Sequence, residues 1–272
     1  MTVLFDTHTH LQLSAFDSDR DEAVRRAIDA SVQYMVVCGD DPPSCQGAFD
    51  LADKHDAVLP TAGYHPHEAA NITEEHFAML RAWSQDDRCM AIGEIGLDYY
   101  RELSPRDVQR RVLEKQLDLA VERALPVLVH SRGAEDEIAE LLEPYAGRSP
   151  LRGTEREVGI MHCFGGTLEQ ARRYVDMGFL VSLACTVTYP KNEEARRIAA
   201  ELPMDKLVIE TDSPFLPPQE RRGKRNEPAF VSAGAQAIAG ARGVSFDEVA
   251  DATTRNALRL FAVEARNEAV PA

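Results

Sequence analysis

Short apolar runs alternate with amphipathic helical patterns along the whole chain. The apolar runs predict strands, and the segments in which apolar residues recur three or four positions apart predict helices. The predicted strands are 3–6, 34–38, 58–62, 90–94, 126–129, 158–161, 179–184 and 207–210. The predicted helices are 19–31, 44–55, 73–83, 105–123, 134–145, 168–177, 192–201, 229–241 and 245–261.

This strict alternation favours a parallel sheet of α/β class. Eight strand–helix units in a chain of 272 residues match a TIM-type (β/α)8 barrel, which usually needs about 250 residues. We therefore predict one barrel domain over residues 1–272. An open doubly wound sheet is the alternative, but no GxGxxG motif follows the first predicted strand.

Polar residues of the metal-ligand type follow the apolar runs. Glu94 and Asp212 each end such a run, and six of the eight histidines stand at the ends of the first, third, fifth and sixth predicted strands. In a parallel barrel the carboxyl ends of all strands meet at one face, so these side chains should converge on a metal site. The six are His8, His10, His65, His67, His130 and His162.

The local spacing adds detail to this prediction. His8 and His10 are two residues apart, so on an extended segment their side chains point the same way. Glu94 would be a buried carboxylate, which is costly unless it is paired or bound to metal, and its two oxygens could bridge two cations. Imidazole and carboxylate ligands suit Zn²⁺, Mn²⁺ or Mg²⁺ and disfavour a calcium cage made only of oxygens.

Other polar residues leave alternatives open. Asp98 could orient a histidine or could be a turn residue, while Glu210 and Asp6 fit a structural or supporting role. The polar loop 147–159 is interpreted as a mobile surface excursion without a catalytic role. The Pro-rich, basic segment 213–229 follows the eighth strand, at the end where barrel active sites lie.

Composition and charge narrow the possible functions. The chain is 44% hydrophobic and 28% charged, and it contains no uncharged apolar stretch long enough to span a membrane. Its net charge of −15 excludes non-specific wrapping around a long polyanion, although a basic loop or metal ions could bind phosphate locally. Five cysteines without a CxxC motif favour a reducing compartment, and the start of the chain lacks a signal-peptide pattern, so we expect a cytoplasmic protein.

Seven segments together resemble the TatD family of metal-dependent deoxyribonucleases. They occur in the order FDTHTHL, GYHPH, GEIGLDYY, VHSR, MHCFGG, ETDSPFL and GKRNEP. The resemblance implies a TIM barrel of the amidohydrolase superfamily with two divalent ions. It assigns the first ion to His8, His10, Glu94 and Asp212. It assigns the second ion to Glu94, His130 and His162, with Glu94 bridging.

The resemblance and the hypothesis of metal-activated hydrolysis together suggest roles for residues around the metals. His65 would contact the substrate or a metal, and His67 would support the site. Asp212 would also accept a proton from the attacking water. Arg225, with Lys224 as a further candidate, would contact phosphate. Gly133 departs from the family pattern, because many members have Asp after HSR, which puts a substrate contact there in doubt.

The predicted function is hydrolysis of a phosphodiester by metal-activated water, in an exonuclease-like deoxyribonuclease that acts on the ends of single-stranded DNA. Two other classes stay open. One is an amidohydrolase or esterase that acts on a small molecule or an aminoacyl ester, and the other is a non-catalytic metal-binding protein. The identity of the metal, the choice of DNA or RNA, the cleavage polarity and the oligomeric state are not predicted.

Overall fold

The computed structural model describes residues 2–265, and over this range strands and helices alternate as predicted. The strands are β1 (Leu4–Thr9), β2 (Val32–Val37), β3 (Val58–Pro60), β4 (Ile92–Asp98), β5 (Val127–Arg132), β6 (Gly159–Met161), β7 (Phe179–Ala184) and β8 (Leu207–Glu210). The helices are α1 (Arg20–Asp29), α2 (Pro42–Ala52), α3 (Glu74–Trp83), α4 (Arg106–Arg123), α5 (Glu135–Arg148), α6 (Leu168–Met177), α7 (Glu193–Glu201), α8 (Val231–Arg242) and α9 (Phe246–Phe261).

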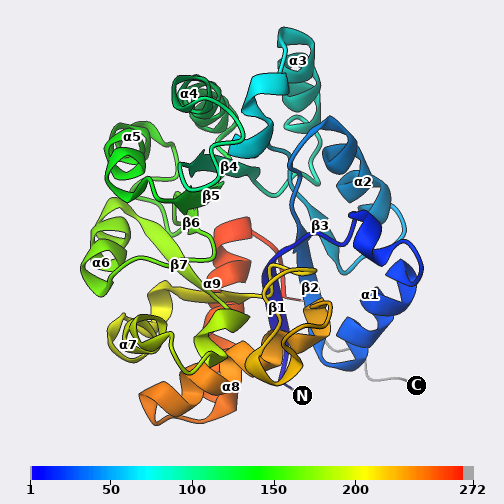
Figure 1. Ribbon diagram of the computed structural model, residues 1–272, viewed down its shortest axis with the longest axis vertical. Coiled ribbons are helices and arrows are strands. Elements are labelled where there is room, and N and C mark those ends of the chain that lie inside the picture. The colour runs from blue at the N-terminus through cyan, green and yellow to red at the C-terminus, as the bar shows by residue number, and fades with distance from the viewer. Residues whose placement is uncertain (1, 266–272) are drawn as a thin grey trace.

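All strand pairs are parallel, in the orders β1-β2-β3 and β4-β5-β6-β7-β8. Isolated bridges join the two groups, one between Ala62 and Ile92 and one between Thr9 and Ser213. The carboxylate of Asp6 strengthens the second junction, because it accepts hydrogen bonds from the backbone N–H and the hydroxyl of Thr211. The fold is the predicted TIM-type barrel, with a ring of helices outside the strands (Figure 1).

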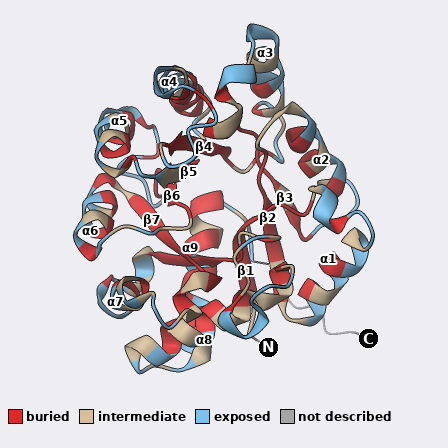
Figure 2. Cartoon of the chain, viewed as in Figure 1, coloured by how far each residue is buried: buried red, intermediate tan, exposed pale blue. Residues whose placement is uncertain are grey.

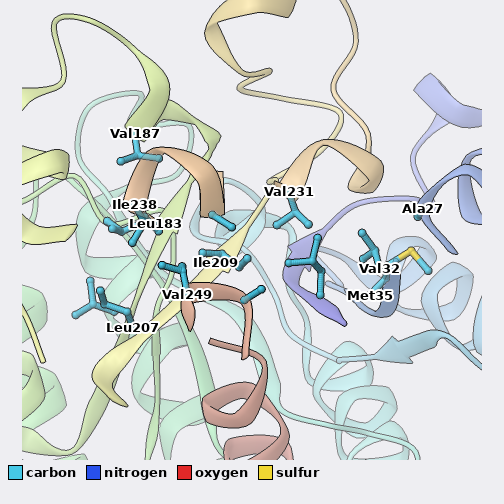
Figure 3. Close-up of a cluster of buried hydrophobic side chains, with 14 of the residues drawn as sticks. Ala27, Val32, Met35, Leu183, Val187, Leu207, Ile209, Val231, Ile238 and Val249 are labelled. Atoms are coloured by element: carbon cyan, nitrogen blue, oxygen red, sulfur yellow. The ribbon is translucent and has the colours of Figure 1, made fainter. Parts of the chain in front are cut away.

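The core lies between the strands and the helices that cover them. The inner faces of the helices are buried and their outer faces are exposed, as amphipathic helices require (Figure 2). On one side of the barrel, Val32 and Met35 of β2 pack in the same apolar cluster as Ile209 of β8 and Ile238 of α8 (Figure 3). Burial of this layer fixes the strands whose carboxyl ends carry the polar residues.

Helix α9 closes the end of the barrel at which the strands begin. Ala257, Leu260 and Phe261 of this helix pack in one cluster with Phe5, Leu180 and Val208, which lie near the starts of their strands. The ring of Phe5 in β1 stacks on the ring of Phe261, with 5.7 Å between their centroids. The amino-terminal end of the barrel is therefore filled with apolar groups, and the polar strand ends lie at the opposite end, called the mouth below.

Element boundaries agree best where apolar residues end abruptly. Helix α6 and strands β7 and β8 have the predicted bounds, and Thr73 caps α3 in a capping box with His76. Strands β1, β4 and β5 extend three or four residues further than predicted, so Glu94 lies inside β4 and not at its end. The strand pairing continues because the polar side chains at the mouth contact one another. The backbone therefore does not have to leave the sheet to bring them into contact with water.

The segment 147–159 begins within α5 and leads into β6, so it lies at the end opposite the mouth. It packs more closely than its composition indicates, since Leu151 and Glu157 are buried. Among the described residues, no helix is both long and apolar enough to cross a lipid bilayer.

Candidate metal centre

Glu94 is the centre of the polar cluster at the mouth. Its side chain is buried, and each of its oxygens faces ring nitrogens from other segments of the chain. Oε1 lies 2.9 Å from Nδ1 of His130 and 3.2 Å from Nε2 of His162. Oε2 lies 3.2 Å from Nε2 of His8. One carboxylate thus joins side chains of β1, β5 and the segment after β6.

The two histidines of the HxH motif point the same way, as their spacing predicts. Nε2 of His8 and Nε2 of His10 are 3.2 Å apart. Nε2 of His10 is also 3.5 Å from Oδ1 of Asp212, which adopts a left-handed backbone conformation with φ of 55°. The structure therefore brings His8, His10, Glu94, His130, His162 and Asp212 together at one place.

A close approach of two strands sets the position of His130. Gly96 of β4 lies directly against His130 of β5, and a Cβ atom at Gly96 would stand 1.9 Å from the carbonyl oxygen of His130. Only glycine allows this contact. The second glycine of the sequence GEIG therefore lets β4 lie close enough to β5 to place Glu94 beside the imidazole of His130.

Carboxylates behind the histidines support the rings. Nδ1 of His162 lies 3.1 Å from Oε1 of the fully buried Glu210, and Nε2 of His130 lies 3.3 Å from Oδ2 of Asp98. A carboxylate on the rear nitrogen of a metal-binding histidine fixes the orientation and tautomer of the ring. These contacts give Glu210 and Asp98 a supporting position next to the predicted ligands.

Asp98 combines both of the alternatives that the sequence left open. Its Oδ2 lies 2.8 Å from Nε2 of His67, in addition to the contact with His130. Its Oδ1 accepts hydrogen bonds from the backbone N–H groups of Tyr100 and Arg101, as a turn residue does. His67 thus contacts the supporting carboxylate.

His65 reaches the cluster itself. Its Nε2 lies 3.5 Å from Oε1 of Glu94, and its Nδ1 accepts a hydrogen bond from the backbone N–H of His67. Burial lowers the pKa of His65 well below its usual value, which keeps the ring neutral. A neutral ring could ligate a metal or donate a hydrogen bond to substrate.

Asp40 is a member of the site that the sequence reasoning missed. It follows β2, and its Oδ2 lies 3.2 Å from Nδ1 of His10. With His10 and Glu94 it forms one of the groups whose ligand atoms lie within 4.8 Å of one another. The signal was present in the segment VVCGD, where a carboxylate follows a strand end, but Gly39 beside it made the segment resemble an ordinary turn.

The spacing of the donor atoms fits bound metal ions. Ligand atoms at 2.0–2.1 Å from a tetrahedral Zn²⁺ are separated by roughly 3.3 Å. The nitrogen pair of His8 and His10 and the nitrogen–oxygen pairs around Glu94 have separations of 2.9–3.7 Å. The spatial grouping keeps His8, His10 and Asp212 together, as the resemblance implies for the first ion, but it also places His8 with Glu94 and His162, and His130 with Glu94 and His65.

The buried groups of this cluster shift one another's pKa values. Burial acts to raise the pKa of Glu94, but His162 and the other histidines around it keep that pKa well below its usual range. Burial opposes the charged form of His10 as well, yet Asp40, Asp212 and Glu94 raise its pKa well above the usual value. Metal ions entering the site would therefore displace protons from the histidines.

Arg225, predicted to contact phosphate, has protein partners in the structure. Its guanidinium donates to both carboxylate oxygens of Asp19 and to the carbonyl oxygen of Ala15, and it lies over the ring of Phe16. These contacts tie the segment after β8 to the start of α1. No contact between Arg225 and the metal-type cluster occurs among residues 2–265, and its role toward substrate stays a prediction.

The comparisons with known proteins agree on one family. The profile of a family described as "TatD related DNase" matches residues 5–262. The chain is 39% identical to an uncharacterized metal-dependent hydrolase, YabD, of Bacillus subtilis, covering 96% of this chain and 100% of that protein. It is 36% identical to the 3'-5' ssDNA/RNA exonuclease TatD of a Rahnella species, covering 97% of this chain and 100% of that protein.

Solved structures support the same fold. A TatD homologue of Escherichia coli, YJJV, matches with a TM-score of 0.89 at 29% identity, covering 96% of this chain and 98% of the other. A hydrolase of the TatD family from Entamoeba histolytica matches with a TM-score of 0.82 at 20% identity, covering 95% and 98%. At this lower identity the match concerns the fold alone.

Proposed function

The chain belongs to the TatD-related DNase family, and on this basis we propose that it is a metal-dependent exonuclease acting on the ends of single-stranded nucleic acid, DNA first. The proposal treats the chain as one hydrolase domain acting in the cytoplasm. The observation that carries it is the environment of Glu94. Within residues 2–265, the ion-pair partners of this buried carboxylate are histidines only.

We assign two divalent ions to this site, of zinc, manganese or magnesium type. His8, His10, Glu94 and Asp212 would hold one ion, and Glu94, His130 and His162 would hold the other. Both carboxylate oxygens of Glu94 face ring nitrogens, which supports a bridging role. Ions bound here would polarise the phosphodiester and lower the pKa of a bound water.

The protein residues have separate tasks in this proposal. Asp212, at the mouth and next to His10, accepts the proton of the attacking water. His65 donates a hydrogen bond to a phosphate oxygen, for which its neutral ring is suited. Asp98 and Glu210 hold the rings of His130 and His162 in place. Arg225 contacts phosphate once it leaves, or shares, its pairing with Asp19.

The experiment measures bound metal in the purified protein and then follows end-labelled single-stranded DNA and RNA. We expect stepwise shortening of linear DNA, loss of activity on chelation, and recovery when a divalent ion is restored. His130→Ala should be inactive. His55→Ala is the matched control, because His55 pairs with Asp21 on the outer surface and should leave activity unchanged.

Two outcomes would contradict separate parts of the proposal. Equal rates on circular and linear single-stranded DNA would reject the preference for strand ends. Full activity of the chelated protein, or of His130→Ala, would reject the metal centre as the catalytic site.

A further inference from the structure

Two aromatic rings are exposed at the mouth. Tyr100, in the loop after β4, is 70% exposed, and Phe215, in the segment after β8, is 52% exposed. Within residues 2–265, the large apolar side chains that are exposed include no other aromatic ring. Strands β4 and β8 lie four positions apart in the eight-stranded order, so the two rings stand on opposite sides of the mouth.

The backbone around Phe215 is fixed although its ring is exposed. Its N–H donates to the carbonyl oxygen of Asp212, and its own carbonyl accepts a hydrogen bond from the buried side chain of Asn226. The ring centroid lies 6.1 Å from that of His10, one of the predicted ligands. The exposed ring is therefore within reach of a substrate bound at this cluster.

Tyr100 is fixed in a similar way on the other side. Its N–H donates to Oδ1 of Asp98, whose second oxygen faces His130 and His67. The guanidinium of Arg132 lies 4.0 Å from the centroid of the Tyr100 ring. Among the described residues Arg132 has no carboxylate partner, so a ring and an uncompensated cation stand together next to His130.

Arg132 belongs to a wider pattern. Most lysines and arginines in residues 2–265 pair with a carboxylate or donate to a carbonyl. Eight side chains in this range do neither, and six of the eight lie at the mouth, at the end of a strand or in a loop that follows one. They are Arg101, Arg132, Lys191, Arg221, Arg222 and Lys224, whereas Lys54 and Arg255 lie elsewhere. In a chain of net charge −15, this leaves the mouth rim as the place where an anionic strand meets the least repulsion.

We propose that Tyr100 and Phe215 stack on nucleobases of a single-stranded nucleic acid, on opposite sides of the bond that is cleaved, while Arg132 binds a phosphate beside Tyr100. This inference rests on the proposed nuclease function and names how the substrate is held. Stacking suits every base, because each has a π-face, so binding would tolerate any sequence. The small rim of cations explains how an acidic protein holds a strand end without a broad basic surface.

The test compares Tyr100→Ala and Phe215→Ala with Tyr100→Phe, Phe215→Tyr and wild type, all loaded with metal, on linear oligothymidylate. Each alanine variant should raise KM about tenfold, toward the low end of base–aromatic stacking, with kcat little changed. The variants that keep a ring should match wild type. Ile28→Ala, an exposed apolar side chain on α1 far from the mouth, is the control for loss of apolar surface.

A second substrate separates stacking from other effects. An oligomer of 5,6-dihydrothymidine keeps the phosphates and the hydrogen-bonding edge but has a non-planar base that stacks poorly. Wild type should lose the contributions of both rings with this oligomer, whereas the double variant Tyr100→Ala/Phe215→Ala should bind the two oligomers equally weakly. If wild type cleaves oligothymidylate and both alanine variants have the KM of wild type, the stacking proposal is wrong while the proposed function stands. A wild-type protein that cleaves neither DNA nor RNA overturns the proposed function, and the stacking proposal falls with it.

Discussion

Two buried glutamates, one at each end of the barrel, have opposite surroundings. Glu157, 6% exposed and just before β6, receives Nζ of Lys206 at 3.1 Å and the guanidinium of Arg259 on both of its oxygens. Glu94, 3% exposed and facing the mouth, is surrounded by histidines. The same side chain is thus compensated by permanent cations at one end and by titratable rings at the other.

The difference separates a structural carboxylate from a functional one. A buried charge must be paired, and lysine and arginine supply that pairing at any physiological pH. Histidines supply it only while protonated, and they lose their protons when a metal ion takes their place. An end of the barrel that relies on histidines is therefore suited to receive external cations, and an end that relies on arginine is closed to them.

The largest expected effect comes from removing the charge of one of these two glutamates. Glu94→Gln should abolish metal retention and lower activity by at least about a thousandfold, the upper range for removing one electrostatic group from a site. Glu157→Gln should keep the metal and full activity but lose about 1–3 kcal/mol of stability, because it leaves charged partners unsatisfied. Bound-metal analysis, nuclease rates and urea unfolding measure the three quantities.

The two glutamine variants serve as controls for each other. Both remove one negative charge from a buried site without changing side-chain volume. If Glu157→Gln also lost its metal, or if Glu94→Gln retained both metal and activity, the assignment of separate roles to the two ends would be wrong.

A smaller effect is expected behind the metal ligands. Asp98→Asn and Glu210→Gln each remove the charge that faces the rear nitrogen of a histidine. Each should weaken metal binding by about 10–100-fold, as is typical for groups that orient ligands. Competition with a metal-sensitive dye measures this affinity. An unchanged affinity in both variants would mean that the rings of His130 and His162 are held by packing alone.

The smallest effect concerns the ion pair of Asp19 and Arg225, which joins α1 to the segment after β8. Arg225→Ala and Asp19→Asn both break this pair, and because it is partly exposed each should cost no more than about 1 kcal/mol of stability. If Arg225 also contacts phosphate, only Arg225→Ala should raise KM while it keeps its metal. Equal KM values in the two variants would restrict Arg225 to anchoring the segment.

The sequence predicts most of the barrel because its information is local. The strands 179–184 and 207–210 are short apolar runs with abrupt ends, and the structure has them with the same bounds. Convergence of the histidines followed from topology alone, since all parallel strands present their carboxyl ends at one face. The sequence does not predict that β4 continues beyond Glu94. Glu94 is polar, and its place inside a strand depends on contacts with histidines from distant segments.

Contacts between distant segments account for the rest. Asp40 looks like a turn residue until β2 is placed beside β1, where it faces His10. Arg225 looks like a free cation in a basic loop until α1 brings Asp19 to it. The two roles of Asp98 cannot be separated from its sequence neighbours, because one oxygen binds the following turn and the other faces residues of two other segments.

Helix α9 has a consequence for how the barrel is made in a cell. The hydroxyl of Thr254 in α9 donates to the carbonyl oxygen of Val3, a separation of 251 residues, and Phe5 finds its stacking partner Phe261 in the same helix. At synthesis rates of about 5–20 residues per second, β1 waits roughly 10–50 seconds for this helix. During that interval the nascent chain exposes an unfinished apolar interior, so its dependence on chaperones should be set by the arrival of α9 at the ribosome exit.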